Sequence, residues 1–245
     1  MPPDLSGVRA KLDRAQHHLE ELRREVVAFR EGEFNGVAYE QNPCSDDWVE
    51  HRLTAVITRQ PDPVIAVVLG DFIQNLRASL DHLVWALARR PNGTTGFPIF
   101  TDRCEFQVIG EKRIARLSSD HRAFIESVQP YHRPYGPNDY LTLLNRLSNE
   151  DKHRLLLPIA TGVRDPPYIA HDGRVRKARF PYRPGTRLEN KAEIIRCEAP
   201  ADMNVELKAA IDVGISGVDM DVLTLCEVLI SSVKRLVIDP LAAAP

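Results

Sequence analysis

Two short polar clusters carry the residue types and spacings in this sequence that suit chemistry. The first is Arg77-Ala-Ser-Leu-Asp-His82, and the second is Asn149-Glu-Asp-Lys-His-Arg154. A histidine can move a proton to or from a reacting group, and an arginine can stabilise negative charge that develops on a phosphate. The candidate catalytic residues are therefore Arg77, His82, Asp151 and Asn149.

Asp151 raises a separate question, because the helical pattern places it close to an apolar stripe. On a helical wheel its direction lies within about 20–40° of Leu144, Leu147 and Leu155. A carboxylate on such a stripe must be paired or protonated, and the cations that suit it are Arg77, His82 and Arg154. The alternative to catalysis is a buried polar network that locks two core helices together. Arg77 and Asp81 also stand four residues apart, a spacing that favours a local ion pair without any function.

Three strings of the chain resemble a widespread group of uncharacterised bacterial and phage proteins. They are LRASLDHLVWAL, FPIF and SNEDKHRLLLP, and the similarity covers residues 70–158. This resemblance implies no particular activity.

The pair Arg77-x4-His82 resembles the Arg–His signature of HEPN ribonucleases. This resemblance implies an endoribonuclease of the toxin or defence type that needs no metal, with RNA as substrate and a cleft formed by two subunits of a homodimer. His82 would act as general acid or base toward the ribose 2′-OH or the leaving oxygen, and Arg77 would stabilise the phosphorane-like charge. Asn149 or Asp151 would support them.

The competing hypothesis is a non-catalytic binding or scaffold protein whose polar core residues are structural. The same loose spacing recurs at Arg116 and His121, at Arg146 and His153, and at Arg164 and His171. Ala78 stands where the HEPN signature has a polar residue, and the β-rich part of the chain is no part of a minimal HEPN bundle.

The sequence gives weaker support to a metal site, a cofactor site and a nucleotide-stacking segment. A metal site could use Asp81, His82, Asp151 and His153 as ligands, but these residues lack a tight ligand spacing. The four cysteines lie far apart without a Cys-x-x-Cys pair, and no glycine-rich nucleotide motif occurs, so we expect no metal and no cofactor. The aromatic segment with Tyr131, His132, Arg133 and Tyr135 could stack on nucleotides or could simply pack.

The composition indicates a globular chain. It has 245 residues, 43% of them hydrophobic, and a formal net charge of −2, so no overall field attracts nucleic acid. The N-terminal segment lacks the apolar core of a signal peptide, and the aliphatic run at residues 64–69 is too short to cross a membrane. Together with the unpaired cysteines, this predicts a cytoplasmic protein.

Hydrophobic periodicity predicts long helices over residues 5–31, 63–90, 138–156 and 221–238, and shorter ones near 104–117 and 121–128. Strands are expected over 37–41, 48–59, 159–163, 174–180, 191–197 and 203–215. The last is the clearest, because every odd position in it is apolar. Residues 42–46 should form the turn between the first two strands.

These elements predict an α+β fold, with a bundle of long helices packed beside a mostly antiparallel sheet in a single domain over residues 1–245. The helical core would comprise residues 1–31, 63–156 and 219–240, and the β portion residues 36–60 and 157–216. The helix over 5–31 carries apolar residues at alternating spacings of three and four, the pattern of a coiled-coil seam. The seam can pack on the central helix of the same chain or on a second copy in a homodimer.

Overall fold

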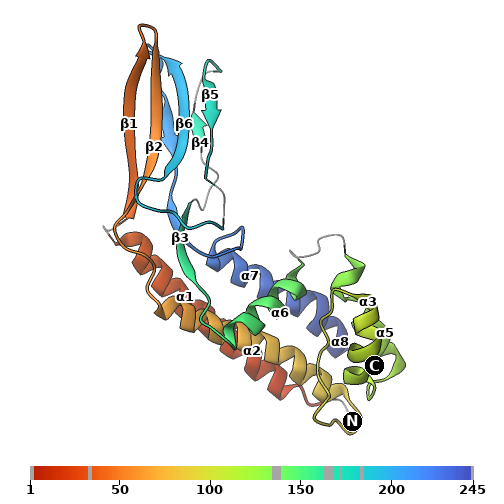
Figure 1. The fold of residues 1–245 in the computed structure, drawn as a ribbon. Helices are drawn as coiled ribbons and strands as arrows, with labels where there is room; N and C mark the ends of the chain where they lie inside the picture. The colour runs from red at the N-terminus through yellow and green to blue at the C-terminus, as the bar shows by residue number, and fades with distance from the viewer. Residues whose placement is uncertain are drawn as a thin grey trace. The chain divides into compact units, whose positions relative to one another are not determined.

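A computed structural model describes residues 3–32, 35–133, 139–162, 168–170, 173–182 and 185–243. It has an α+β fold that contains helices and antiparallel sheets (Figure 1). Contacts between Cα atoms group the chain into two units. The helical unit comprises Met1–Leu22, Val67–Leu156 and Leu225–Pro245, and the sheet unit comprises Arg23–Ala66 and Leu157–Thr224. That the whole chain is one domain stays a prediction.

Helices make up most of the helical unit, although three of them begin or end in the sheet unit. In chain order they are α1 (Ser6–Glu31), α2 (Val64–Leu87), α3 (Arg103–Glu105), the π-helical turn η1 (Phe106–Gly110), α4 (Glu111–Ile114), α5 (Ser119–Ser127), the 3₁₀ turn η2 (Pro130–His132), α6 (Tyr140–Asp151), α7 (Val222–Val233), the π-helical turn η4 (Lys234–Ile238) and α8 (Asp239–Ala243). The predicted helices are confirmed, with ends that differ by a few residues.

The central helix α2 buries the apolar face that its periodicity predicts. Asp62 caps its start, because Asp62 Oδ1 accepts a hydrogen bond from the backbone N–H of Val64 at 2.9 Å. Within the helical unit, the apolar side chains of α2 with no exposed surface are Leu69, Phe72, Ile73, Leu76, Leu80, Leu83 and Val84. Burial of each contributes about 1.5–3 kcal/mol of transfer free energy.

The seam of α1 packs inside its own chain, which was the intramolecular alternative. Val8, Ala15, Leu19 and Leu22 are at most 2% exposed. A second copy cannot reach these side chains, so the expected dimer through this seam is wrong. A homodimer formed through another surface stays a prediction.

The described residues of the sheet unit form three antiparallel sheets. The largest has the order β1-β2-β6-β5, formed by β1 (Asn35–Ser45), β2 (Trp48–Ile57), β6 (Glu193–Pro200) and β5 (Arg176–Arg179). Strand β3 (Pro158–Gly162) pairs with β8 (Ile211–Ile215), and β4 (Tyr168–Ala170) pairs with β7 (Glu206–Lys208). The predicted sheet, in which the early hairpin joins the later strands, is confirmed by the pairing of β2 with β6.

Two predictions about strands need correction. The expected strand over 203–215 is divided into β7 and β8, because its two halves pair with different partners. The alternating pattern does not specify the neighbouring strand, so one pattern can run through two strands with different partners. The first turn is also shorter than expected, since β1 continues to Ser45 through a bulge and Ser45 pairs with Trp48. That leaves only Asp46 and Asp47 in the turn.

None of the helices in the described part of the chain is both long and apolar enough to cross a membrane.

A buried ion pair joins α1 to β8 inside the sheet unit. Asp212 is 1% exposed. Its two carboxylate oxygens accept hydrogen bonds from Arg30, with Nε to Oδ1 at 2.9 Å and Nη2 to Oδ2 at 2.6 Å. The backbone N–H of Val213 donates a further bond to Oδ1 at 2.7 Å. Burial raises the pKa of Asp212, and these donors oppose that effect.

Removal of this carboxylate should leave the partly buried guanidinium of Arg30 without its partner. We expect Asp212→Ala to lower the free energy of unfolding by about 3–5 kcal/mol, measured by urea denaturation. The matched control is Asp202→Ala, because Asp202 pairs with Arg174 at 3.5 Å on the surface. An exposed pair contributes no more than about 1 kcal/mol. Equal losses for the two variants would show that the Arg30–Asp212 pair is not structural.

Candidate functional site

Asp151, which the sequence places near an apolar stripe, is held by an uncharged side chain. Gln74 Nε2 on α2 donates to Asp151 Oδ2 at 3.1 Å and to the backbone carbonyl of Ser148 at 2.9 Å. Ser148 Oγ donates back to Gln74 Oε1 at 3.2 Å. The prediction that Asp151 bonds to Arg77, His82 or Arg154 is therefore wrong, because an amide satisfies the carboxylate and Arg154 pairs with Glu150.

The carboxylate of Asp151 also lies directly against the backbone of α2. A Cβ built on Gly70 would be 2.2 Å from Asp151 Oδ1, which is closer than real Cβ contacts come. Gly70 therefore provides the space that α6 needs at this point of the helix pair. The glycine stands in the middle of a helix, where it costs about 1 kcal/mol relative to alanine.

Arg77 and Asp81 together bind the backbone N–H and C=O of Phe97, an arrangement that we call the Phe97 clamp. Arg77 Nη2 donates to the carbonyl of Phe97 at 2.8 Å, and the N–H of Phe97 donates to Asp81 Oδ1 at 2.8 Å. Arg77 Nη1 lies 2.9 Å from the same carboxylate oxygen, so the expected local ion pair is confirmed. The clamp fixes the start of the Phe97–Phe100 segment, in which Phe97 has no exposed surface.

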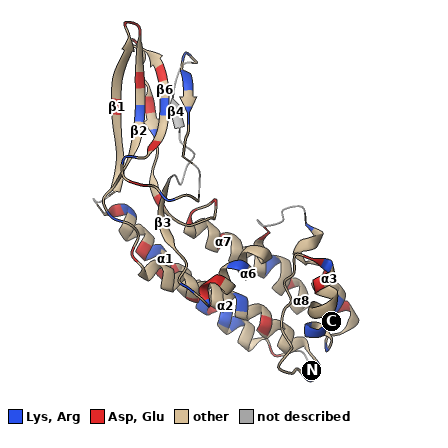
Figure 2. Cartoon of the chain, viewed as in Figure 1, with Lys and Arg blue, Asp and Glu red and all other residues tan. Residues whose placement is uncertain are grey.

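A cavity of about 400 Å³ opens beside the clamp, and we call it the Arg77 pocket. Its lining joins α2, α4, α6 and the segment after α2, and both signs of charge occur along α2 and α6 (Figure 2). The cationic lining residues are Arg77, Arg113 and Lys152, and the amides are Gln74, Asn145 and Asn149. The lining also includes one carboxylate, Asp81, and the apolar residues Ala78, Ile99 and Phe100.

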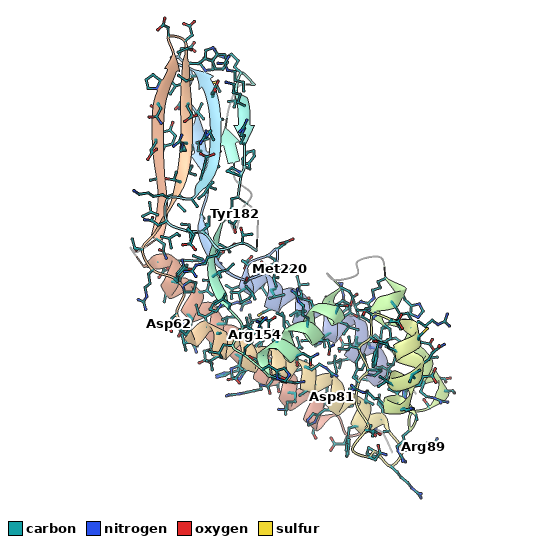
Figure 3. The ribbon with its side chains drawn as sticks, viewed as in Figure 1. Asp62, Asp81, Arg89, Arg154, Tyr182 and Met220 are labelled. Carbon is teal, nitrogen blue, oxygen red and sulfur yellow. The ribbon has the colours of Figure 1, made fainter. Side chains whose placement is uncertain are left out.

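The structure brings two of the four candidate residues to this pocket. Arg77 and Asn149 line it, whereas Asp151 and His82 do not. His82 is exposed and lies at α1, where a Cβ on Gly7 would come within 2.5 Å of His82 Nδ1. Five helical residues separate the directions of Arg77 and His82 by about 140° around the axis. Asp81, the residue before His82 on α2, is labelled in Figure 3 and marks this part of the helix.

The alternative sites from the sequence do not assemble. Among the described residues, no group of three or more His, Cys, Asp and Glu side chains is placed to hold a metal ion. Tyr131 packs its ring against Phe106, and Arg133 lies over the ring of Tyr140, so the aromatic segment packs on its own unit. Tyr135 lies outside the described residues.

Sequence reasoning missed Arg113 and Asn145. Arg113 comes from α4, in a segment that carries no motif, and only the fold brings it beside α2. Asn145 stands about one turn before the predicted cluster on α6, and the spacing of helix faces was the one signal for it. Gln74 belongs to no motif in the sequence.

No protein-family model, no curated protein and no solved structure matches this chain. The resemblances read from the sequence therefore stay predictions.

The contact between Gly70 and Asp151 predicts that Gly70→Ala destabilises the chain when Asp151 is present and stabilises it when Asp151 is replaced by alanine. Gly70→Ala should destabilise the wild-type chain, because the new methyl group displaces the Asp151 carboxylate from Gln74. In the Asp151→Ala background the same change should stabilise by up to about 1 kcal/mol, because alanine is the better helix former. Urea unfolding of the four proteins tests this, and additive effects would contradict it.

Proposed function

We propose that this chain is a non-catalytic binding protein, and that the Arg77 pocket takes a small ligand carrying a phosphate group. One observation carries the proposal. Arg77 Nη1 is buried at the pocket and forms no hydrogen bond, although it lies within ion-pair distance of Asp81. An unused donor on a buried guanidinium is costly, and a phosphate oxygen is a suitable acceptor for it.

The charges around the pocket favour an anion. Three cations against one carboxylate leave the lining with an excess of two positive charges. Asp81 is already engaged by Arg77 and by the N–H of Phe97. Lys152 Nζ is held loosely by Asn149 Oδ1 at 3.4 Å, and both residues are exposed. The positive charge is therefore local, in a chain whose formal net charge is −2.

The size and the remaining walls suit a nucleotide. A volume of about 400 Å³ falls in the range of small-ligand sites. Phe100 offers a flat apolar wall for a base, and Asn145 and Asn149 can both donate and accept hydrogen bonds at its edge. A free nucleotide and the end of an RNA strand present the same chemistry to these side chains.

Binding can be measured by titration with inorganic phosphate, AMP and a short RNA. Arg113→Met should weaken the binding of all phosphate-bearing ligands roughly tenfold to a hundredfold, the value of a charged hydrogen bond. Arg113 is exposed, so this change should not disturb folding. Arg89→Met is the control, because Arg89 is exposed and does not line the pocket (Figure 3).

The three titrations separate the possible ligands. Binding of AMP without binding of RNA would identify a mononucleotide pocket. Tighter binding of RNA than of AMP would identify an RNA strand as the ligand. If none of the three binds at millimolar concentration, or if Arg89→Met weakens binding as much as Arg113→Met, the proposal is wrong.

A second candidate function is a HEPN-like endoribonuclease, and the exposure of His82 favours it. A buried histidine could not reach RNA, and His82 is exposed on the same helix as Arg77. Because the two side chains leave α2 in different directions, this hypothesis needs a second copy of the chain to complete the cleft. Light scattering that shows a monomer at high concentration would therefore exclude it.

The nuclease hypothesis predicts cleavage of total RNA by the wild-type chain in EDTA. His82→Ala should lower the rate by about 10²–10⁴, as expected for a lost general acid or base. Its melting temperature should stay unchanged, since the side chain is exposed. If the RNA stays intact after incubation with the wild-type chain, the nuclease hypothesis is wrong and binding is the one proposed function that remains.

A further inference from the structure

In the sheet unit, three side chains of the first hairpin form a hydrogen-bonded group around one phenol oxygen. Tyr39 Oη on β1 lies 2.5 Å from His51 Nδ1 on β2, and their rings are stacked with centroids 6.0 Å apart. Gln41 Nε2 donates to the same phenol oxygen at 2.6 Å. The strand register explains the group, because Gln41 is the direct partner of His51 and Tyr39 lies two residues away on the same face.

The donors in this group can be assigned. The amide nitrogen of Gln41 can only donate, so the phenol oxygen accepts from it and has its own hydrogen free for His51. His51 is 2% exposed, and its burial lowers its pKa, so the imidazole stays neutral near pH 7 and Nδ1 can accept that hydrogen. His51 Nε2 is buried without a hydrogen-bond partner.

Among the described residues that face His51, none carries a formal charge that would disturb this assignment. Its partner on β6 is Cys197, which is fully buried. Burial raises the pKa of the Cys197 thiol, so the thiol stays protonated. Val205 packs against Cys197 and is apolar. On β1 the group that faces His51 is the neutral amide of Gln41.

The phenol, unlike its partner, faces solvent. Tyr39 is 44% exposed and lies on β1, the edge strand of the four-stranded sheet. A reactive hydroxyl at the surface with a buried neutral base within hydrogen-bond distance is the arrangement of an activated nucleophile. Gln41 adds a donor that can stabilise the phenolate as its charge develops.

We propose that Tyr39 is a nucleophile assisted by His51, and that it accepts a group from an electrophile with a tetrahedral phosphorus or sulfur centre and a leaving group. In this step the Tyr39 oxygen forms a bond to phosphorus or sulfur, and the bond from that centre to the leaving group breaks. The leaving group departs with the electron pair. The phenol proton passes to His51 Nδ1 and then to solvent.

The test uses a small aryl sulfonyl fluoride, whose fluoride ion is the leaving group. Labelling of each tyrosine is followed by peptide mass spectrometry. We expect Tyr39 to react at least about 10²-fold faster than Tyr182, the lower end of the usual gain from a positioned base. Tyr182, which is labelled in Figure 3, is the internal reference, because it is partly exposed and its oxygen bonds to the Thr161 hydroxyl and the Thr186 carbonyl, and to no imidazole of the described residues.

The dependence of the rate on pH separates assistance by a base from a structural hydrogen bond. An unassisted phenol reacts as phenolate, so its rate falls about tenfold for each pH unit below about 10. With His51 as base, the Tyr39 rate should stay flat as long as the imidazole is neutral. His51→Phe keeps a ring in the core and should restore both the low rate and the steep dependence.

Gln41→Leu provides a second variant, because Gln41 is exposed and its loss leaves the core unchanged. It should slow labelling of Tyr39 without restoring the steep dependence on pH. If His51→Phe fails to fold, the pH dependence of Tyr39 labelling in the wild-type chain and the Gln41→Leu variant still test the proposal. A Tyr39 rate in the wild-type chain that equals the Tyr182 rate, or that falls tenfold per pH unit, overturns the proposal.

Discussion

The helical unit depends on how α2 satisfies the polar groups that interrupt its apolar surface. Arg77 is largely buried, and an arginine in that position must find hydrogen-bond acceptors or an ion-pair partner. It uses the Phe97 carbonyl and the Asp81 carboxylate, which in turn accepts the Phe97 N–H. Two charged side chains one helical turn apart thus bind both backbone polar groups of one residue, Phe97. The loop that follows α2 is fixed at this point, and the position of Phe100 at the Arg77 pocket follows from it.

The regular elements of this chain could be predicted because they repeat a simple pattern. Leu69, Phe72, Ile73, Leu76, Leu80 and Leu83 specify the buried face of α2 by spacing alone, and the ion pair of Arg77 with Asp81 follows from the same geometry. The partner of Asp151 could not be predicted in this way. The sequence predicts the position of Asp151 on α6. The residue of α2 that faces Asp151 depends on how the two helices pack. Gln74 is the partner of Asp151 because of the direction of its side chain on α2, and not because of a charge.

The sheet unit shows the same limit for strands. Every odd position of 203–215 is apolar, yet Asp212 at an even position of β8 is buried too. Alternation also contains no information about the neighbouring strand, and the segment pairs with two strands. His51 was an exception to the alternation of β2 because a histidine is polar. Its position is nevertheless on the inward side with Leu53 and Ala55. A polar residue at an apolar position of a strand was the one signal in the sequence for the Tyr39–His51 group.

Direction around a helix also decides which function the helical unit supports best. A short motif such as Arg77-x4-His82 implies a joint action of two side chains, but five residues on an α-helix turn them well away from each other. The residues that do meet at Arg77 come from α4 and α6, and they are cations and amides, which bind anions but do not transfer protons near neutral pH. General acid–base catalysis needs a group that can exchange a proton at that place. The one carboxylate of the pocket, Asp81, is already engaged by Arg77 and the Phe97 N–H. The cations and amides around Arg77 therefore favour the proposed binding of an anion over proton transfer.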